Sequence, residues 1–142
     1  RPPRRTARQR TLMAHYLDTS AFLKLVVAEA ESEPLRRWAV SNSIQLVASD
    51  LLRTEALRAA RRHSPEALLR TRAALETVAL VAVTADICER AAELDPSILR
   101  SLDALHLATA LALGDDLEAV VTYDERLAAA CSAHGVPVLA PR

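Results

Sequence analysis

The sequence predicts an α/β protein in which helices cover both faces of a short parallel sheet of four to five strands, giving three layers (α/β/α). Its apolar runs are short and lack the alternation of a half-exposed strand, so the strands are expected to be buried on both faces. Helical segments separate these runs throughout the chain. The composition agrees, because 142 residues with 51% hydrophobic residues, 3% aromatic residues and two glycines favour one helix-rich domain.

The expected strands are apolar runs of Val, Leu, Ile and Ala, and the first of them leads directly into Asp18. Each run is too short for a helix of ordinary length. In chain order, the strands are placed at residues 16–17, 44–48, 78–83, 119–122 and within 134–141.

The expected helices follow polar residues that can cap them. Ser32 is placed as the N-cap of the second helix, Ser49 or Asp50 as the cap of the third, and Ser101 as the cap of a very apolar helix that stops at Gly114. In chain order, the helices are placed at residues 20–30, 31–43, 51–63, 64–77, 84–94, 101–113 and 124–133.

The charges divide the chain into a basic N-terminal segment and an acidic body. Residues 1–12 hold five arginines and no acid, while the whole chain has a formal net charge of zero. We therefore expect residues 1–12 to form a disordered basic tail and residues 13–142 to form the single domain. An acidic body argues against a nonspecific nucleic-acid coat, but it is compatible with a nucleic-acid enzyme whose acids hold cations.

Several classes of protein are disfavoured by what the sequence lacks. Two distant cysteines indicate neither a disulfide framework nor a zinc site. No apolar run is long enough to span a membrane, and the basic N-terminus is not followed by a secretory signal. We expect a cytoplasmic protein without membrane contact. The sequence also has no phosphate-binding GxxxxGK[ST] loop and no G-x-S-x-G nucleophile turn.

Four carboxylates occupy positions where an α/β protein places its active site. Asp18 follows the first strand, Glu55 lies one turn into the helix after the second, and Asp124 follows the fourth. Asp103 lies in the first turn of the most apolar helix. Ligands of parallel sheets bind outside the carboxyl ends of the strands, so the four acids are candidates for one crevice.

Each acid also has a structural interpretation. Asp18 could cap the first helix, although Thr19 or Ser20 could replace it in that role. Glu55 could pair with Arg58 on the helix surface. Asp103 could interact with the helix dipole, and Asp124 could cap the last helix. His106 is more typical of a hydrogen-bonded core histidine than of a ligand.

A divalent cation would resolve the repulsion among four converging carboxylates. Like charges raise one another's pKa values, so such a cluster is unstable without a counter-ion. Mg²⁺ and Mn²⁺ prefer carboxylate oxygens and water, and a metal-bound water can attack a phosphodiester.

Four segments in order resemble the successive motifs of PIN domains, and more closely those of the VapC toxins of bacterial VapBC toxin–antitoxin modules. They are YLDTSAFLKL, TEALRA, RSLDALHLATA and VVTYDERL. The resemblance covers essentially residues 13–142. It implies a PIN-like α/β/α fold and a Mg²⁺- or Mn²⁺-dependent endoribonuclease that cuts tRNA or ribosomal RNA and thereby inhibits translation.

The resemblance also implies roles for individual residues. Three acids would hold the metal directly or through water, and the fourth would complete the shell or orient the attacking water. Two hydroxyl groups would support them. In this order, the residues are Asp18, Asp103 and Asp124, then Glu55, then Ser20 and Thr122.

The resemblance further implies protein partners. A cognate VapB-like antitoxin would occupy a hydrophobic groove, for which Leu35 and Trp38 on one face of the second helix are candidates. The resemblance also implies a homodimer, which would reach operator DNA only through the antitoxin.

Three alternatives to a ribonuclease are weighed against the same residues. A haloacid-dehalogenase-like phosphatase needs a second Asp two residues after the first, where this chain has Ser20. A receiver-type phosphoacceptor domain would need early paired acids and a late Lys, but the single Lys is Lys24. A non-catalytic binding module remains open, and it would keep its partners without metal-dependent cleavage.

Overall fold

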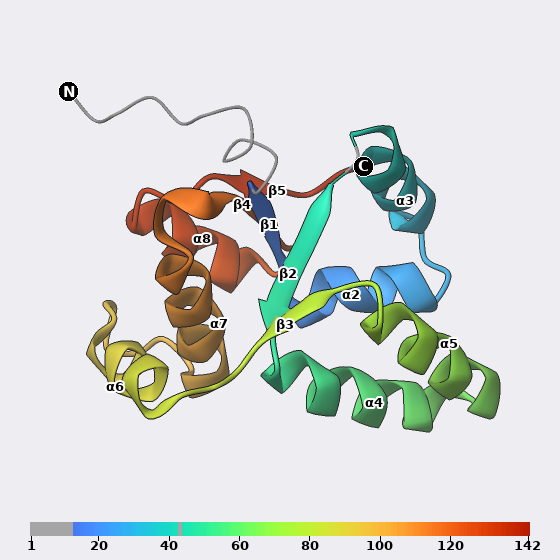
Figure 1. Cartoon of the computed structure of the whole chain (residues 1–142), viewed down its shortest axis with the longest axis horizontal. Helices are drawn as coiled ribbons and strands as arrows, with labels where there is room; N and C mark the ends of the chain where they lie inside the picture. The colour runs from blue at the N-terminus through green and yellow to red at the C-terminus, as the bar shows by residue number, and fades with distance from the viewer. Residues whose placement is uncertain (1–12, 43) are drawn as a thin grey trace.

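A five-stranded parallel sheet runs through the middle of the computed structural model, which describes residues 13–42 and 44–142 (Figure 1). The strand order is β3-β2-β1-β4-β5, and all neighbours are parallel. The strands are β1 (Ala14–Leu17), β2 (Gln45–Ser49), β3 (Ala79–Val81), β4 (Leu117–Val121) and β5 (Val138–Leu139). The predicted sheet is confirmed at the upper end of its expected strand number.

Seven α-helices connect and cover these strands within the described residues. Figure 1 shows α2 to α5 on one side of the sheet and α6 to α8 on the other. The helices are α2 (Thr19–Val26), α3 (Ser32–Ser41), α4 (Leu51–His63), α5 (Pro65–Leu75), α6 (Ala85–Glu93), α7 (Ser101–Ala112) and α8 (Glu125–Ala133). The α/β/α class predicted from the sequence is therefore confirmed.

Alternate residues of the central strands enter two different cores. On β1, Leu17 packs into the core under α2 to α5, whereas Tyr16 packs into the core under α7 and α8. Val121 and Val120 of β4 divide in the same way. Because successive side chains of a strand point to opposite faces, this division places a hydrophobic layer on each side of the sheet.

Two of the predicted helix caps are wrong by one residue. Ser32 and Ser101 are the first residues of α3 and α7, and neither cap position makes a side-chain bond. Ser32 Oγ instead joins the preceding loop, because it donates to the carbonyl of Val27 and accepts the N–H of Glu29. The helix predicted over residues 20–30 ends earlier, at Val26.

The strand order reverses direction next to β1, and this is where a crevice is expected. The chain moves from β1 to β2 and β3 on one side, then returns to β4 on the other. The backbone N–H of Asp18 donates to the carbonyl of Val121, which joins the carboxyl ends of β1 and β4. In open α/β sheets, ligands bind at such a switch point.

Two further expectations concern the basic tail and the absence of a membrane-spanning segment. The predicted basic tail, residues 1–12, lies outside the described residues. No helix within the described part of the chain is long and apolar enough to span a membrane.

Candidate active site

Asp18 lies at the carboxyl end of β1 with a side chain that is only 4% exposed. Its Oδ1 accepts the backbone N–H of Ala21 at 2.9 Å, so Asp18 is the N-cap of α2. The expectation that Thr19 or Ser20 could take over this cap is wrong, since both lie inside the helix. Capping uses part of one carboxylate and leaves Asp18 aimed at the switch point of the sheet.

Two hydroxyl groups surround the same carboxylate. Thr122 Oγ1 donates to Asp18 Oδ2 at 2.6 Å, and Ser20 Oγ lies 2.8 and 3.0 Å from the two oxygens. Each hydroxyl also accepts a backbone N–H, Thr122 from Asp124 and Ser20 from Tyr123. The loop after β4 is thus fastened to Asp18 by the two residues predicted to support it.

Burial dominates the ionisation of Asp18. Loss of water raises the pKa of its carboxyl group, and the hydrogen bonds from Thr122, the Ala21 N–H and Ser20 only partly oppose that rise. A carboxylate that is hard to ionise in a buried site gains from a nearby cation.

Glu55 approaches the crevice from the second turn of α4 and is held differently. Its Oε1 accepts from Thr19 Oγ1 at 2.8 Å and from His106 Nε2 at 2.8 Å. Burial alone would raise the pKa of Glu55, but these two hydrogen bonds and the charge of His106 outweigh it and leave the pKa below its usual value. The alternative of a surface pair with Arg58 is replaced by this contact with His106.

His106 connects Glu55 to the core of the domain. The ring is buried, and its Nδ1 lies 2.7 Å from the hydroxyl of Tyr16, which comes from β1. Because the ionised Glu55 can only accept, Nε2 must carry the proton of the bond between them. The structural interpretation of His106 is confirmed in that it is buried and hydrogen-bonded, yet its partner is one of the candidate acids.

Asp103 lies in the first turn of α7 and Asp124 is the N-cap of α8, and the charge of Asp124 acts on Asp103. Burial raises the pKa of Asp103, the negative charge of Asp124 raises it further, and His106 and Arg100 partly counteract these effects. Asp124 Oδ1 accepts the N–H groups of Arg126 and Leu127, so its predicted capping role is confirmed. Caps of this kind leave the second carboxylate oxygen for other contacts.

The structure brings the four acids into one electrostatic neighbourhood. Asp103 responds to the charges of Asp124 and Glu55, while Asp18 responds to that of His106, which bonds Glu55. Within residues 13–42 and 44–142, however, no three acidic, His or Cys side chains are already arranged to hold a metal ion. The donors fit a hard divalent cation in chemistry, being carboxylate and hydroxyl oxygens, and in electrostatics, because burial and like charges raise two of their pKa values.

The two residues suggested for a partner groove differ in exposure. Leu35 is 1% exposed and belongs to the core, so it is not part of an open groove in this structure. Trp38 is half-buried, packs edge-on against His15 at 5.0 Å, and lines a surface pocket of about 270 Å³. That pocket lies between α3 and the C-terminus, which run side by side (Figure 1).

Sequence reasoning does not assign Thr19 or His106 to the site. Thr19 is predicted only as a possible cap, although it directly follows Asp18. His106 lies three residues after Asp103, so helical spacing gives a signal for it. No local signal indicates that its partner is Glu55, which is 51 residues away in the sequence.

Comparison with known sequences shows which family this chain matches and which proteins it is similar to. The family described as "PIN domain" matches residues 15–132. Ribonuclease VapC46 of Mycobacterium tuberculosis is 42% identical over 130 residues, which cover 92% of this chain and 99% of that protein. Ribonuclease VapC47 of the same species is 37% identical over 130 residues, covering 89% of this chain and 96% of that protein.

Solved structures show the same fold at lower sequence identity. One is Mycobacterium tuberculosis VapC20, described as a toxin that cleaves the sarcin-ricin loop, with a TM-score of 0.67, 20% identity, and coverage of 82% of this chain and 95% of that chain. Another is a toxin–antitoxin complex from Klebsiella pneumoniae, with a TM-score of 0.69, 24% identity, and coverage of 91% of this chain and 98% of that chain.

Proposed function

The chain belongs to the PIN-domain family, among the VapC ribonucleases, and we propose that it is a metal-dependent endoribonuclease toxin. The observation that carries this proposal is the position of Asp18, 4% exposed at the switch point of the sheet and linked electrostatically through His106 to the three further acids. The relatives named ribonucleases, which align along about nine tenths of the chain, support the same activity.

We propose that Asp18, Asp103 and Asp124 hold Mg²⁺ or Mn²⁺ directly or through water. The bound ion would supply a water of lowered pKa and neutralise charge on the phosphate oxygens. Ser20 and Thr122 would keep the Asp18 carboxylate in its orientation through the hydrogen bonds described above.

Glu55 is suited to a different task from Asp18. Its pKa lies below the usual value, so it is ionised at neutral pH and can accept a hydrogen bond from the attacking water. Thr19 and His106 hold its Oε1, which fixes the direction of the other carboxylate oxygen. In this mechanism, Glu55 orients the water that attacks an RNA phosphodiester, or completes the metal shell.

The substrate and partners follow from the family and are proposals of the same kind. We propose tRNA or ribosomal RNA as the substrate, with inhibition of translation as the result. The likeness to the toxin–antitoxin complex from Klebsiella pneumoniae supports a cognate antitoxin as partner. The antitoxin would contact the exposed side of Trp38, and would link a homodimer of the toxin to operator DNA.

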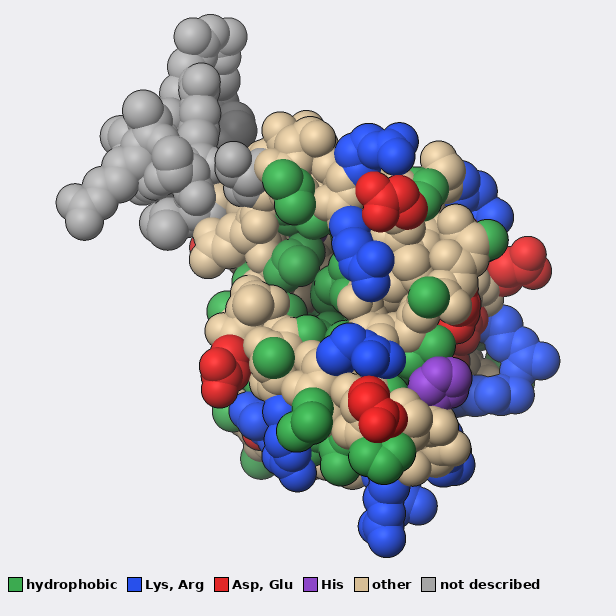
Figure 2. All heavy atoms as spheres, turned by 90° about the vertical axis from the view of Figure 1, so that its right-hand side faces the viewer, with side chains coloured by type: hydrophobic (Ala, Val, Ile, Leu, Met, Phe, Trp, Pro, Cys, Tyr) green, Lys and Arg blue, Asp and Glu red, His purple; other side chains and the backbone are tan. Residues whose placement is uncertain are grey.

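The outer side of α3 and α5 offers little support for a broad RNA-binding surface. Figure 2 shows Lys and Arg side chains spread over this side of the molecule, with hydrophobic side chains between them. A spread of single charges differs from the basic stripe of a general nucleic-acid binder. The proposal of RNA binding therefore rests on the crevice that holds the acids and not on this face.

The test is an RNA cleavage assay on the purified, antitoxin-free protein. Total tRNA and ribosomal RNA are incubated with Mn²⁺, Mg²⁺ or EDTA, and Asp18→Asn is compared with Asp115→Asn, which changes an exposed acid that is none of the four. Asn at residue 18 can still cap α2, so the fold is retained. We expect discrete fragments that require metal, a loss of at least about a hundredfold in rate for Asp18→Asn, and no change for Asp115→Asn.

Two results would contradict the proposal. Fragments that persist equally in EDTA and in Asp18→Asn would show that the four acids do not perform the cleavage. Absence of cleavage by the folded protein with either metal would favour the non-catalytic binding module.

A further inference from the structure

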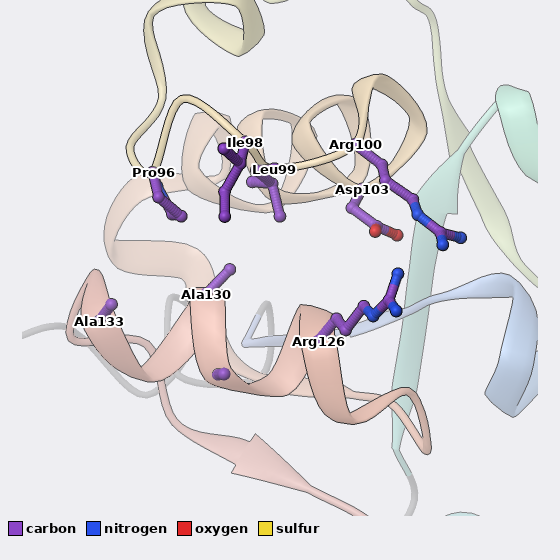
Figure 3. Close-up of a pocket in the computed structure, with 9 residues that line it drawn as sticks. Pro96, Ile98, Leu99, Arg100, Asp103, Arg126, Ala130 and Ala133 are labelled. Carbon is purple, nitrogen blue, oxygen red and sulfur yellow. The ribbon is translucent and has the colours of Figure 1, made fainter.

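A groove of about 440 Å³ runs between the segment that precedes α7 and the facing side of α8. The segment before α7 contributes Pro96, Ile98 and Leu99, and α8 contributes three alanines. Figure 3 shows these apolar side chains at one end and Arg100, Asp103 and Arg126 at the other. The groove thus changes from apolar to charged along its length, and its charged end contains a candidate active-site acid.

The apolar end holds a side chain that the core does not use. Ile98 is 89% exposed, whereas its neighbour Leu99 packs against two of the hydrophobic clusters. Ile is among the residues most often buried, and an exposed Ile on the wall of a groove is typical of a contact surface. The alanines opposite leave open space because their side chains are small.

The charged end combines one acid with two arginines. The guanidinium groups of Arg100 and Arg126 extend to the same side as the carboxylate of Asp103 (Figure 3). Arg100 lies near enough to Asp103 to lower its pKa against the effect of burial. Arginines beside an acid that binds a cation would contact the phosphates on either side of the one being cut.

We propose that this groove binds one unstacked nucleotide of the RNA, adjacent to the phosphodiester that is cleaved. The base would lie between Ile98 and the α8 alanines, and its phosphate would meet Arg100 and Arg126. The charges favour RNA over an apolar peptide as the ligand, because Arg100 and Arg126 at the charged end of the groove complement phosphate. Proteins that read RNA insert splayed bases into such sites, and the volume is in the range of small-ligand pockets.

This inference rests on the proposed ribonuclease function, but its first test does not need cleavage. The protein is labelled at its alanine methyl groups and titrated with each nucleoside 5′-monophosphate in NMR experiments. Ala129→Leu fills the groove from an exposed position of α8, and Ser132→Leu adds similar bulk to an exposed position of α8 outside the groove. We expect saturable shifts of Ala129, Ala130 and Ala133 at millimolar nucleotide, retained in Ser132→Leu and abolished for Ala130 and Ala133 in Ala129→Leu.

Other outcomes would overturn the inference. One is the absence of groove shifts with all four nucleotides, and another is equal shifts in Ala129→Leu. Shifts of the same methyl groups on concentrating the protein without nucleotide would instead identify an interface between copies of the chain. Groove binding without any RNA cleavage would contradict the ribonuclease proposal while leaving a nucleotide site.

A second test uses the mapped cleavage site. An RNA oligonucleotide carrying that site is compared with versions in which the base on either side of the cut is removed. We expect removal of one base to raise KM about 5- to 150-fold, the range for a stacked base, with a smaller effect in Ala129→Leu. Unchanged KM for both abasic oligonucleotides, with normal cleavage by the wild type, would overturn the groove alone.

Discussion

Asp18 caps α2 and Glu55 accepts a hydrogen bond from Thr19, the first residue of that helix, yet the two carboxylates have opposite pKa shifts. Asp18 is nearly sealed from water and its partners are hydroxyl and backbone donors, so burial raises its pKa. Glu55 is less buried and is bonded to a histidine, so its pKa is lowered. Acids of one crevice with diverging pKa values are typical of divided catalytic roles.

The difference arises from where each residue is placed in the fold. Asp18 ends a central strand, where the sheet and α2 exclude water. Glu55 comes from α4 and reaches across to α7, where His106 is held in turn by Tyr16. The carboxylate of Asp18 therefore needs a nearby cation to ionise readily, whereas the carboxylate of Glu55 is already stabilised in its ionised form.

The largest expected effect comes from removing the partner of Glu55. His106→Leu fills the buried volume but leaves Glu55 and Tyr16 without their shared partner. We expect a loss of about 3 kcal/mol in the free energy of unfolding, as when one partner of a buried pair is removed. Urea unfolding measures it, and Tyr16→Phe, which removes only the buried hydroxyl beside His106 Nδ1, should cost less.

A difference of under about 0.5 kcal/mol between His106→Leu and wild type would mean that the histidine does not support Glu55. The comparison between the two acids would then lose its physical basis.

A smaller effect is expected at Asp18 when one hydroxyl is removed. Thr122→Val keeps the shape but removes the 2.6 Å bond to Asp18 Oδ2, at a cost of about 1.5–3 kcal/mol for a bond to a charged group. Thr71→Val is the control, since Thr71 is also buried but its hydroxyl donates to the Ala67 carbonyl. Only Thr122→Val should raise the pKa of Asp18 further and weaken Mn²⁺ binding. Calorimetry measures the Mn²⁺ affinity of both variants. Equal affinity would contradict the proposed role of Thr122.

The pH dependence of stability should separate the two acids by sign. As pH rises, the unfolded chain releases the Asp18 proton before the native state does, so this group lowers stability through that range. Glu55 does the reverse, because its native pKa is lower: its contribution is present at neutral pH and is lost as pH falls through that pKa.

Asp18→Asn should therefore melt above wild type at neutral pH without metal, and Glu55→Gln should melt below it. Both differences should shrink in acid, and each kcal/mol corresponds to about 4 °C in Tm for a domain of this size. Thermal unfolding in EDTA from pH 3 to pH 8, in roughly unit steps, measures both variants. Differences of the same sign would contradict the assignment.

The positions of the acids could be predicted because local sequence patterns place each acid next to an apolar strand or near the start of a helix. Asp18 and Asp124 lie next to apolar strands, and a parallel sheet brings strand ends to one edge. The supporting role of Thr122 could be predicted for the same reason, because its hydroxyl directly follows β4.

The contacts between elements could not be predicted in the same way. The bond between Glu55 and His106 depends on how α4 and α7 pack across the sheet, which no local pattern records. Leu35 has the spacing of an exposed groove residue, but only the packing of α3 shows that it belongs to the core. The exposed Ile98 also differs from its half-buried neighbour Leu99 only through the path of the segment before α7.

The most direct test is a titration of the individual carboxyl groups by ¹³C NMR, with and without Mg²⁺. Without metal, we expect Asp18 and Asp103 to titrate above the ordinary range for Asp and Glu55 to titrate below the ordinary range for Glu. Mg²⁺ should lower the apparent pKa values of Asp18 and Asp103, because the cation favours their ionised forms. Titration curves of both aspartates that are unchanged by Mg²⁺ would contradict the proposal that this crevice is a metal-dependent active site.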